Sequence, residues 1–227
     1  MKLRLLLALC AAVLVLTGQK YSSGLNLPSS WPWDQAYVDE PDGSLTIVPD
    51  RSPVSGYDRS CKAGRACVFG PAWTDDVDVR NGRNGCDQRS DVLRESLEQI
   101  QLKPGTNGCI VASGVLRDPY TGQTVIYQRG GNTEVVADHV IPLAAAWDLG
   151  AAQWSSRKRQ NFANDPRNLI ITTSRANLSK GDKTPGEWMP EHERCRYAQA
   201  YLEVARAYGV ALTRVDQRAL IAAIGRC

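Results

Sequence analysis

An acid and an imidazole stand side by side at the end of an apolar, β-branched run in the middle of the chain. The run begins at Val135, reaches Asp138 and His139, and is stopped by Pro142, which cannot continue a strand. An imidazole titrates near neutral pH, and a carboxylate is a hard oxygen ligand for divalent cations. The sequence therefore places a candidate general base and a candidate metal ligand at one strand end.

A second strand and a helix are expected farther along the chain. Residues 168–172 (NLIIT) form a short apolar run, and Ser174 is a suitable cap for a helix that carries Asn177. If this strand and helix pack together, the Asp138 carboxylate and the Asn177 amide oxygen converge on a cation. We then expect His139 beside that cation, free to deprotonate a water.

Each of these residues also has a purely structural explanation. A buried histidine satisfied by an aspartate is the usual interpretation of a single Asp-His pair. Asn168 alone is typical of a turn and Asn177 of a solvated helix face, while Lys180 and Lys183 alone would be surface charge. The joint spacing along strand, strand and helix favours a functional site over these alternatives.

The joint pattern resembles the ββα-metal finger of HNH nucleases. D-H-V-I-P is followed by N-L and then by N-x-x-K, with Asn168 and Asn177 nine residues apart. The chain is similar to the C-terminal nuclease domain of GmrSD-type restriction endonucleases and to secreted actinobacterial HNH-like proteins, which share A-N-D-x-x-N-L and K-G-D-K. The resemblance covers Val135 to Pro185 and extends more weakly from Tyr57 to Cys227.

This resemblance implies a fold and a set of roles. The fold is α+β: a ββα-metal (His-Me) finger with a small antiparallel sheet, flanking helices and disulfide staples. The roles are a general base (His139), two metal ligands (Asp138 and Asn177), a residue that ties the loop between the strands (Asn168), and a phosphate or leaving-group contact (Lys180). Asn177 stands where many members have a final histidine, which favours one Mg²⁺ or Mn²⁺ ion over zinc.

Positive charge is concentrated near the candidate site. The formal net charge of the chain is +3, but between Arg157 and Lys183 seven basic residues face two acidic ones. Such a cluster suits a polyanion, because neutralising phosphates gives affinity that does not depend on base sequence. The expected substrate-binding residues are Arg89, Arg159, Arg175 and Lys183. The alternative for this cluster is a solvated surface.

Two loop features have competing interpretations. Arg89, at the start of a predicted helix, either reaches a phosphate or pairs with Asp87 or Asp91, and we favour the pairing. The acids Asp75, Asp76 and Asp78 are interpreted as a solvated loop in preference to a cation site.

The N-terminal part is expected to lie outside the catalytic domain. Lys2, Arg4 and an apolar run to Leu16 predict a signal peptide over residues 1–18. Residues 19–55 are rich in proline and predict an extended arm, in which Trp31 and Trp33 are expected to dock on the domain. Residues 56–227 are the predicted nuclease domain, with the finger at 135–185.

The cysteines agree with export. Apart from Cys10 in the apolar run, the chain has six cysteines, an even number typical of disulfides in an exported protein. Six cysteines allow fifteen connectivities. Proximity and the family resemblance favour three pairs: Cys61 with Cys67, Cys86 with Cys109, and Cys195 with Cys227. A zinc site is the alternative, but the close Cys-x-x-Cys spacing is missing.

Other elements are predicted from periodicity and turn residues. A helix is predicted after Cys86, with an apolar stripe that extends to Ile100. Two strands, 109–116 and 123–127, flank the turn sequence DPYTG and predict a hairpin. We expect this hairpin to share a sheet with the strand that ends at His139. Four further helices are predicted at 142–147, 155–162, 194–208 and 213–224. Trp147, Trp154 and Phe162 are expected in the core, and His192 at the surface.

Together these observations predict a secreted or cell-envelope, divalent-metal-dependent endonuclease with little sequence specificity. Its partner would be nucleic acid, DNA in preference to RNA, and it would act as a monomer without integral membrane association after processing. The alternative is an exported, disulfide-stapled binding or envelope protein that keeps the scaffold without turnover, because fold alone does not establish function. A third possibility is a toxin module delivered to competitors.

Overall fold

The computed structural model describes residues 45–131 and 134–227. Its strands are β1 Ile47–Val48, β2 Glu98–Leu102, β3 Val111–Arg117, β4 Thr124–Gln128, β5 Val135–His139, β6 Leu169–Thr173 and β7 Leu212–Thr213. Its helices are α1 Gln88–Ser96, α2 Leu143–Asp148, η1 Ala151–Gln153, α3 Ser156–Asn164, η2 Pro166–Asn168, α4 Ser174–Lys180, α5 Arg194–Tyr208 and α6 Arg214–Ile224. The fold is therefore mixed α and β. The predicted signal peptide and Trp31 and Trp33 lie outside the described residues.

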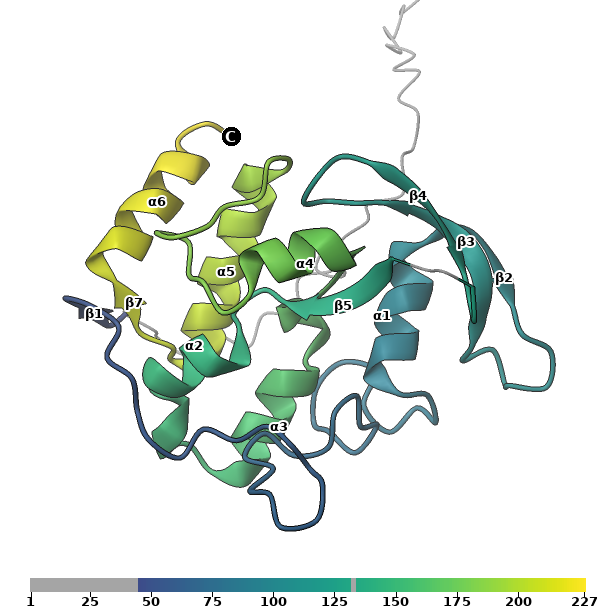
Figure 1. Cartoon of the computed structure of the whole chain (residues 1–227), viewed down its shortest axis with the longest axis horizontal. Helices are drawn as coiled ribbons and strands as arrows, with labels where there is room; N and C mark the ends of the chain where they lie inside the picture. The colour runs from purple at the N-terminus through teal and green to yellow at the C-terminus, as the bar shows by residue number, and fades with distance from the viewer. Residues whose placement is uncertain (1–44, 132–133) are drawn as a thin grey trace, which may run out of the picture.

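The strands form small separate sheets. Strands β2, β3 and β4 make an antiparallel sheet, β5 and β6 form an antiparallel pair, and β1 pairs in parallel with β7. In Figure 1 strand β5 and helix α4 lie between the three-stranded sheet on one side and helices α5 and α6 on the other. The predicted hairpin is present as β3 and β4, but our expectation that it shares a sheet with β5 is wrong.

The β5–β6 pair separates two hydrophobic clusters. Val135, Leu169 and Ile171 pack with side chains of α1, β3 and β4, whereas Ile170 packs with side chains of α2, α4 and α5. Successive side chains of a strand point to opposite faces, so β6 supplies both clusters, whereas β5 supplies hydrophobic residues only to the first. This explains why all five residues of β6 are buried.

The turn at residues 118–122 connects the sheets through Asp118. This aspartate is buried and accepts hydrogen bonds from the hydroxyl groups of Thr172 (2.7 Å) and Thr173 (2.9 Å) on β6. It also accepts from the backbone N–H of Tyr120 and the hydroxyl of Thr121 within its own turn. The turn sequence thus does more than reverse the chain, because it anchors the hairpin to β6.

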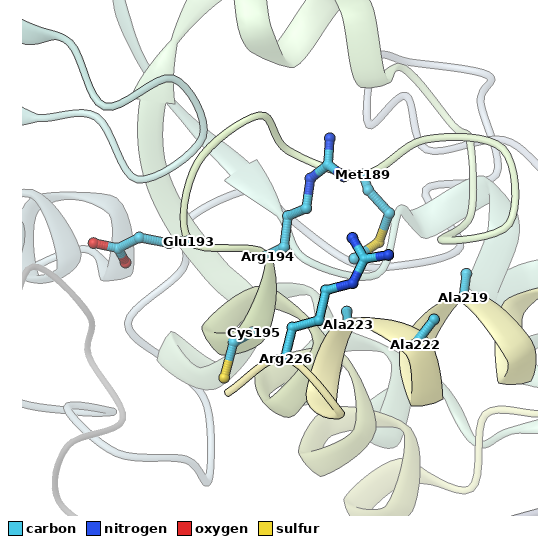
Figure 2. A pocket seen from close by; sticks show the side chains of 8 residues that line it. All are labelled: Met189, Glu193, Arg194, Cys195, Ala219, Ala222, Ala223 and Arg226. Carbon is cyan, nitrogen blue, oxygen red and sulfur yellow. The ribbon is translucent and has the colours of Figure 1, made fainter.

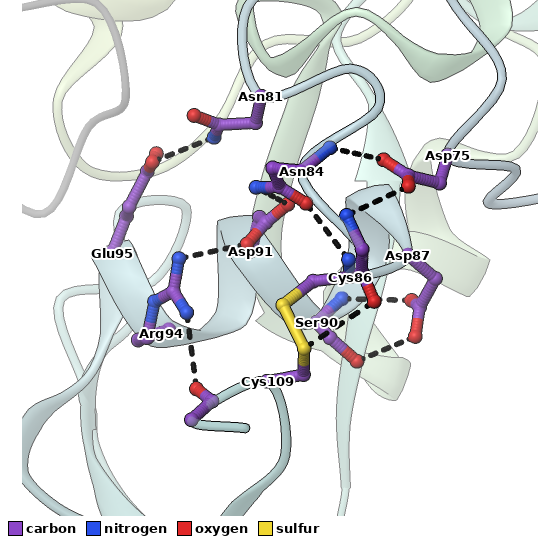
Figure 3. A network of polar contacts seen from close by, with 12 residues as sticks. Asp75, Asn81, Asn84, Cys86, Asp87, Ser90, Asp91, Arg94, Glu95 and Cys109 are labelled. Carbon is purple, nitrogen blue, oxygen red and sulfur yellow. Dashed lines mark hydrogen bonds and ion pairs between the residues drawn. A yellow bond between two sulfur atoms is a disulfide. The ribbon is translucent and has the colours of Figure 1, made fainter. Parts of the chain in front are cut away.

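Helix α1 begins in a dense polar network (Figure 3). Asp87 caps it by accepting from the Ser90 backbone N–H, and a disulfide joins the preceding Cys86 to Cys109. The helix ends at Ser96, earlier than the predicted stripe, and Ile100 belongs to β2. Leu97 at the end of the helix has an extended ψ of 141°, which starts the strand.

The remaining helical predictions agree closely with the structure. Helix α5 has the predicted bounds and ends at Gly209 in the left-handed conformation (φ 69°). Thr213 and Asp216 form the capping box of α6. One cap differs: Thr173, and not Ser174, accepts from the Ala176 N–H at the start of α4.

Part of the expected arm lies against the domain. Strand β1 pairs with β7, and the Arg51 guanidinium donates to Asp148 at 2.7 Å and to Asp182 at 3.0 Å. The Trp147 indole N–H donates to backbone carbonyls at Val54 and Ser55, each at 3.2 Å. Residues 45–55 therefore contact β7, the end of α2 and the loop that follows α4.

The three expected disulfides are present. They join Cys61 to Cys67, Cys86 to Cys109, and Cys195 to Cys227. The last pair connects the start of α5 with the end of the chain.

Candidate active site

Strand β5 delivers Asp138 and His139 to opposite faces of the β5–β6 pair. The register places Asp138 beside Ile170 and His139 beside Leu169. Asp138 contacts α4, whereas the imidazole of His139 lies against Trp73, which packs on the cluster formed with α1. The structure therefore does not bring the two side chains together, in contrast to our expectation that His139 sits beside a cation held by Asp138.

His139 is fixed by one hydrogen bond and one ring contact. Its Nε2 lies 2.8 Å from the carbonyl oxygen of Ala163, and its ring stacks on Trp73 with centroids 5.7 Å apart and planes 11° apart. A carbonyl oxygen only accepts, so Nε2 carries the proton and Nδ1 of the neutral ring keeps its lone pair. The described part of the chain offers Nδ1 no hydrogen-bond donor or acceptor.

Burial keeps this imidazole neutral. Desolvation lowers the pKa of His139 to about 4, although the bond to Ala163 and the charge of Asp138 act in the opposite direction. The positive charges of Lys180 and Arg59 add to the lowering. At neutral pH His139 is therefore a proton acceptor through Nδ1, which is the protonation state that a general base requires.

Asp138 lies in a closed polar cluster with Tyr120 and Lys180. The Lys180 ammonium lies 3.0 Å from Asp138 Oδ2 and 3.2 Å from Oδ1, and the Tyr120 hydroxyl donates to Oδ2 at 2.9 Å. Asp138 is 6% exposed and Lys180 0%. Burial raises the pKa of the Tyr120 hydroxyl, and the neighbouring Asp138 charge raises it further, so this hydroxyl stays a donor.

Asn168 connects the two ends of the insertion between β5 and β6. Its Oδ1 accepts from the Ile141 N–H at 2.8 Å, and its Nδ2 donates to the Phe162 carbonyl at 3.2 Å. The side chain is fully buried. Asn168 thus holds the segment that follows His139 against the end of α3, where Ala163 supplies the oxygen bound by His139.

Asn177 lies half-buried on α4, which packs against both β5 and β6. Its backbone carbonyl accepts from the Gly181 N–H at 2.8 Å. Within the described residues its side-chain amide forms no hydrogen bond, so its oxygen is available to a ligand.

The residues of the predicted metal site fit a magnesium ion only in part. Both carboxylate oxygens of Asp138 are already bonded to Lys180, whose positive charge opposes a second cation in the same place. The amide oxygen of Asn177 remains a suitable hard ligand. Among residues 45–131 and 134–227, no group of three or more His, Cys, Asp or Glu side chains could hold a metal ion.

The residues expected to contact the substrate differ in burial and in hydrogen-bond partners. Arg159 donates to the carbonyls of Val68 and Trp154 and lies over the Trp147 ring, so its guanidinium holds loops together. Lys180 is enclosed, and a direct phosphate contact does not match this position. Lys183 is exposed and donates to the Ser179 carbonyl.

Arg175 and Arg89 remain accessible. Arg175 is exposed, Arg89 is partly exposed, and the structure shows no ion pair for either within its described ranges. The preferred pairing of Arg89 is wrong, because Asp87 accepts from Ser90 and Asp91 pairs with Arg94.

Acidic partners neutralise much of the basic cluster. Arg157 pairs with Asp78, Arg167 with Asp165, and Lys180 with Asp138. The Arg157 and Arg83 guanidiniums hold the pKa of the Asp78 carboxyl well below its usual range. Asp75 accepts from two backbone N–H groups, at Asn84 and Gly85. The carboxylates of the acidic loop therefore bond to other groups of the protein.

Three groups at the site were not found from the sequence. Trp73 was given no role, Tyr120 was considered only as part of the DPYTG turn, and the Ala163 carbonyl was not considered. Ala163 had a signal, because it belongs to the A-N-D-x-x-N-L pattern. Trp73 carries a positive φ of 61°, which is costly for a large side chain and invisible in the sequence.

A pocket of about 490 Å³ lies elsewhere, between the start of α5 and α6 (Figure 2). Met189 and the alanines of α6 form its apolar wall, and Arg194 and Arg226 reach over it. It contains none of the predicted catalytic residues. Its neighbour Cys195 is tied to Cys227, so we interpret this pocket as part of the α5–α6 packing.

Comparison with known families decides the identity of the domain. Residues 87–223 match the family described as "GmrSD restriction endonucleases, C-terminal domain". The chain belongs to this family. The matched range starts at the cap of α1 and runs through β5, β6, α4 and most of α6, so the GmrSD C-terminal domain includes every predicted catalytic and metal-binding residue.

A relative described as secreted supports an extracellular location. An "Uncharacterized secreted protein" of Arthroderma benhamiae (strain ATCC MYA-4681 / CBS 112371) is 32% identical over 146 residues, which span 63% of this chain and 68% of the relative. The three disulfides of this GmrSD C-terminal domain protein are consistent with an extracellular location. No solved structure matches the chain. No helix in the described ranges is long and apolar enough to cross a bilayer.

Proposed function

We propose that this protein is an exported endonuclease that hydrolyses phosphodiester bonds, with His139 as general base. The observation that carries the proposal is the bond from His139 Nε2 to the Ala163 carbonyl, which leaves Nδ1 as the basic atom of a neutral ring. Membership of the GmrSD C-terminal domain family supports the nuclease class. The β5, β6 and α4 arrangement agrees with the ββα finger that the sequence pattern implies.

The reaction follows from the state of His139. Nδ1 accepts a proton from a water, and the resulting hydroxide attacks phosphorus. The bond from phosphorus to the leaving oxygen breaks, that oxygen takes up a proton from solvent water, and His139 returns its proton to solvent. Stacking on Trp73 and the bond to Ala163 restrict the imidazole to one orientation. A bound phosphodiester adds negative charge near the ring, which raises the pKa of His139 and makes it a stronger base.

Magnesium or manganese is part of the proposal, with a changed ligand set. Magnesium commonly keeps several waters and takes only one or two protein oxygens together with substrate phosphate. Asn177 is the protein ligand that fits, whereas Asp138 does not. The ion would neutralise charge on the phosphate. The cations proposed to contact the nucleic acid are Arg175 and Lys183, which are exposed, and Arg89, which is partly exposed. DNA is the preferred substrate.

One observation favours the competing function, an exported binding protein that retains the scaffold without turnover. The neutralised basic cluster and the Asp138–Lys180 pair leave less free charge than the sequence suggested. His139 argues for turnover, because a scaffold has no use for a free Nδ1 on an oriented imidazole.

The test is plasmid cleavage by purified, oxidised protein with magnesium, repeated with a chelator and with Asn177→Ala. We expect nicking and linearisation that the chelator stops, and a requirement for more magnesium in Asn177→Ala. Protein that binds plasmid but leaves it intact both in magnesium and in manganese would support the scaffold function instead.

A further inference from the structure

Lys180 is the last residue of α4, and its side chain is turned into the protein. Its ammonium has three N–H donors. It lies within 3.2 Å of both Asp138 oxygens and donates to the backbone carbonyl of His139 at 2.7 Å. The ammonium is therefore satisfied entirely by the residues at the end of β5.

Burying the charged Lys180 ammonium is energetically costly unless all its N–H groups are hydrogen-bonded. Desolvation lowers the pKa of Lys180, and the charge and hydrogen bond of Asp138 oppose that change. An unpaired charge in such a place is strongly unfavourable, whereas a fully bonded pair is tolerated. Asp138 and Lys180 therefore depend on each other, and a divalent ion at Asp138 would have to expel the ammonium.

The bond to the His139 carbonyl gives the pair a second consequence. The imidazole of His139 points away from Lys180, but its peptide carbonyl is held by Lys180 on the α4 side. The ring itself is held by Trp73 and Ala163 on the other side. The proposed base is thus fixed from both faces of the β5–β6 pair.

We propose that Lys180 is the resident cation of Asp138, and that the two act as positioning residues for His139 and not as metal ligand and phosphate contact. The inference rests on the proposed nuclease function for its catalytic consequence only. The Asp138–Lys180 pair fixes the peptide that carries the base, and as long as Lys180 is present the Asp138 carboxylate takes no part in metal binding.

The test compares wild type with Asp138→Asn, Lys180→Met and the double variant. Asparagine keeps an acceptor for the Tyr120 hydroxyl. Thermal melting, Mn²⁺ binding by electron paramagnetic resonance, and kcat and KM on a DNA substrate are measured for each. Mn²⁺ binding and melting do not need turnover, so they decide the assignment of Asp138 even if wild type cleaves nothing and the proposed function fails.

Each measurement has a distinct expected result. Both single variants should melt well below wild type, and the double variant should melt higher than the two losses added together predict, because the two charges are coupled. Asp138→Asn should leave Mn²⁺ binding within twofold of wild type. Lys180→Met should bind Mn²⁺ more tightly, since it leaves the carboxylate without its cation.

The double variant distinguishes a role of the pair in positioning His139 from a role in protein stability alone. If it regains stability, its kcat should still be at least tenfold below wild type with KM unchanged, because nothing holds the His139 carbonyl. A wild-type kcat in a stable double variant would overturn the positioning role. Tenfold weaker Mn²⁺ binding by Asp138→Asn at an unchanged melting temperature would overturn the assignment of Lys180 as the cation.

Discussion

Asp138 and His139 are neighbours in the chain but occupy different environments. Asp138 is enclosed with Lys180 and Tyr120, and every one of its oxygens has a partner. His139 lies between Trp73 and Ala163 and has one ring nitrogen bonded and one available. The difference follows from strand alternation, which sends adjacent side chains to opposite faces. In this Asp-His pair, strand alternation places one side chain in an internal ion pair and leaves the other with an unbonded ring nitrogen.

Removing the imidazole of His139 should have the largest effect on cleavage. His139→Ala should lower cleavage by about 10² to 10⁴-fold, the contribution typical of a general base, while melting stays near that of wild type. Plasmid cleavage and thermal melting measure the two effects. The matched control is His192→Ala, because His192 is the only other histidine and is exposed. Equal cleavage by the two variants would remove His139 from the mechanism.

Two disulfides lie in different parts of the molecule, one beside α1 and one beside α5. Cys86–Cys109 ties the start of α1, on the His139 face, and Cys195–Cys227 ties α5 to the chain end. Replacing either pair by serines should cost about 2–5 kcal/mol of unfolding free energy, measured by denaturant titration. Only loss of Cys86–Cys109 should also lower cleavage by the remaining folded protein. An equal loss of activity in both variants would show that the two sides do not differ.

The stack of Trp73 on His139 is expected to orient the imidazole. A stacked aromatic pair contributes about 0.5–1.5 kcal/mol, so Trp73→Ala should lower kcat by up to about tenfold, with a small change in KM. Trp73→Phe keeps a ring at the same place and should retain most of the activity. Steady-state kinetics of the two variants check this, and full activity in Trp73→Ala would show that the stack does not orient the base.

The sequence predicted the elements of this site better than their orientations. Periodicity and caps located α5 and α6, and the motif located β5, β6 and α4. Asn168 was expected to tie the loop, and its amide forms the bonds that this requires. These features depend on local patterns that a single sequence contains.

The partners of charged side chains were harder to predict. The basic residues from Arg157 to Lys183 were interpreted as a patch because their partners, such as Asp78, are distant in the chain. Lys180 has the surface character of any lysine until α4 is packed on Asp138. Trp73 reaches His139 through a left-handed backbone conformation that no residue type indicates. Such contacts are set by tertiary packing, which spacing alone does not specify.

The most direct test of the account is the tautomer and charge of His139 measured by nitrogen-15 nuclear magnetic resonance. The protein has two histidines, so a His192→Gln variant leaves the signals of His139 alone. We expect a neutral ring protonated at Nε2 at pH 7, with Nδ1 unprotonated, and an apparent pKa of about 4 in the free protein. The base would then lose its lone pair only as the pH falls through that value. A ring protonated at Nδ1, or a charged imidazolium at pH 7, would contradict the assignment of His139 as the general base.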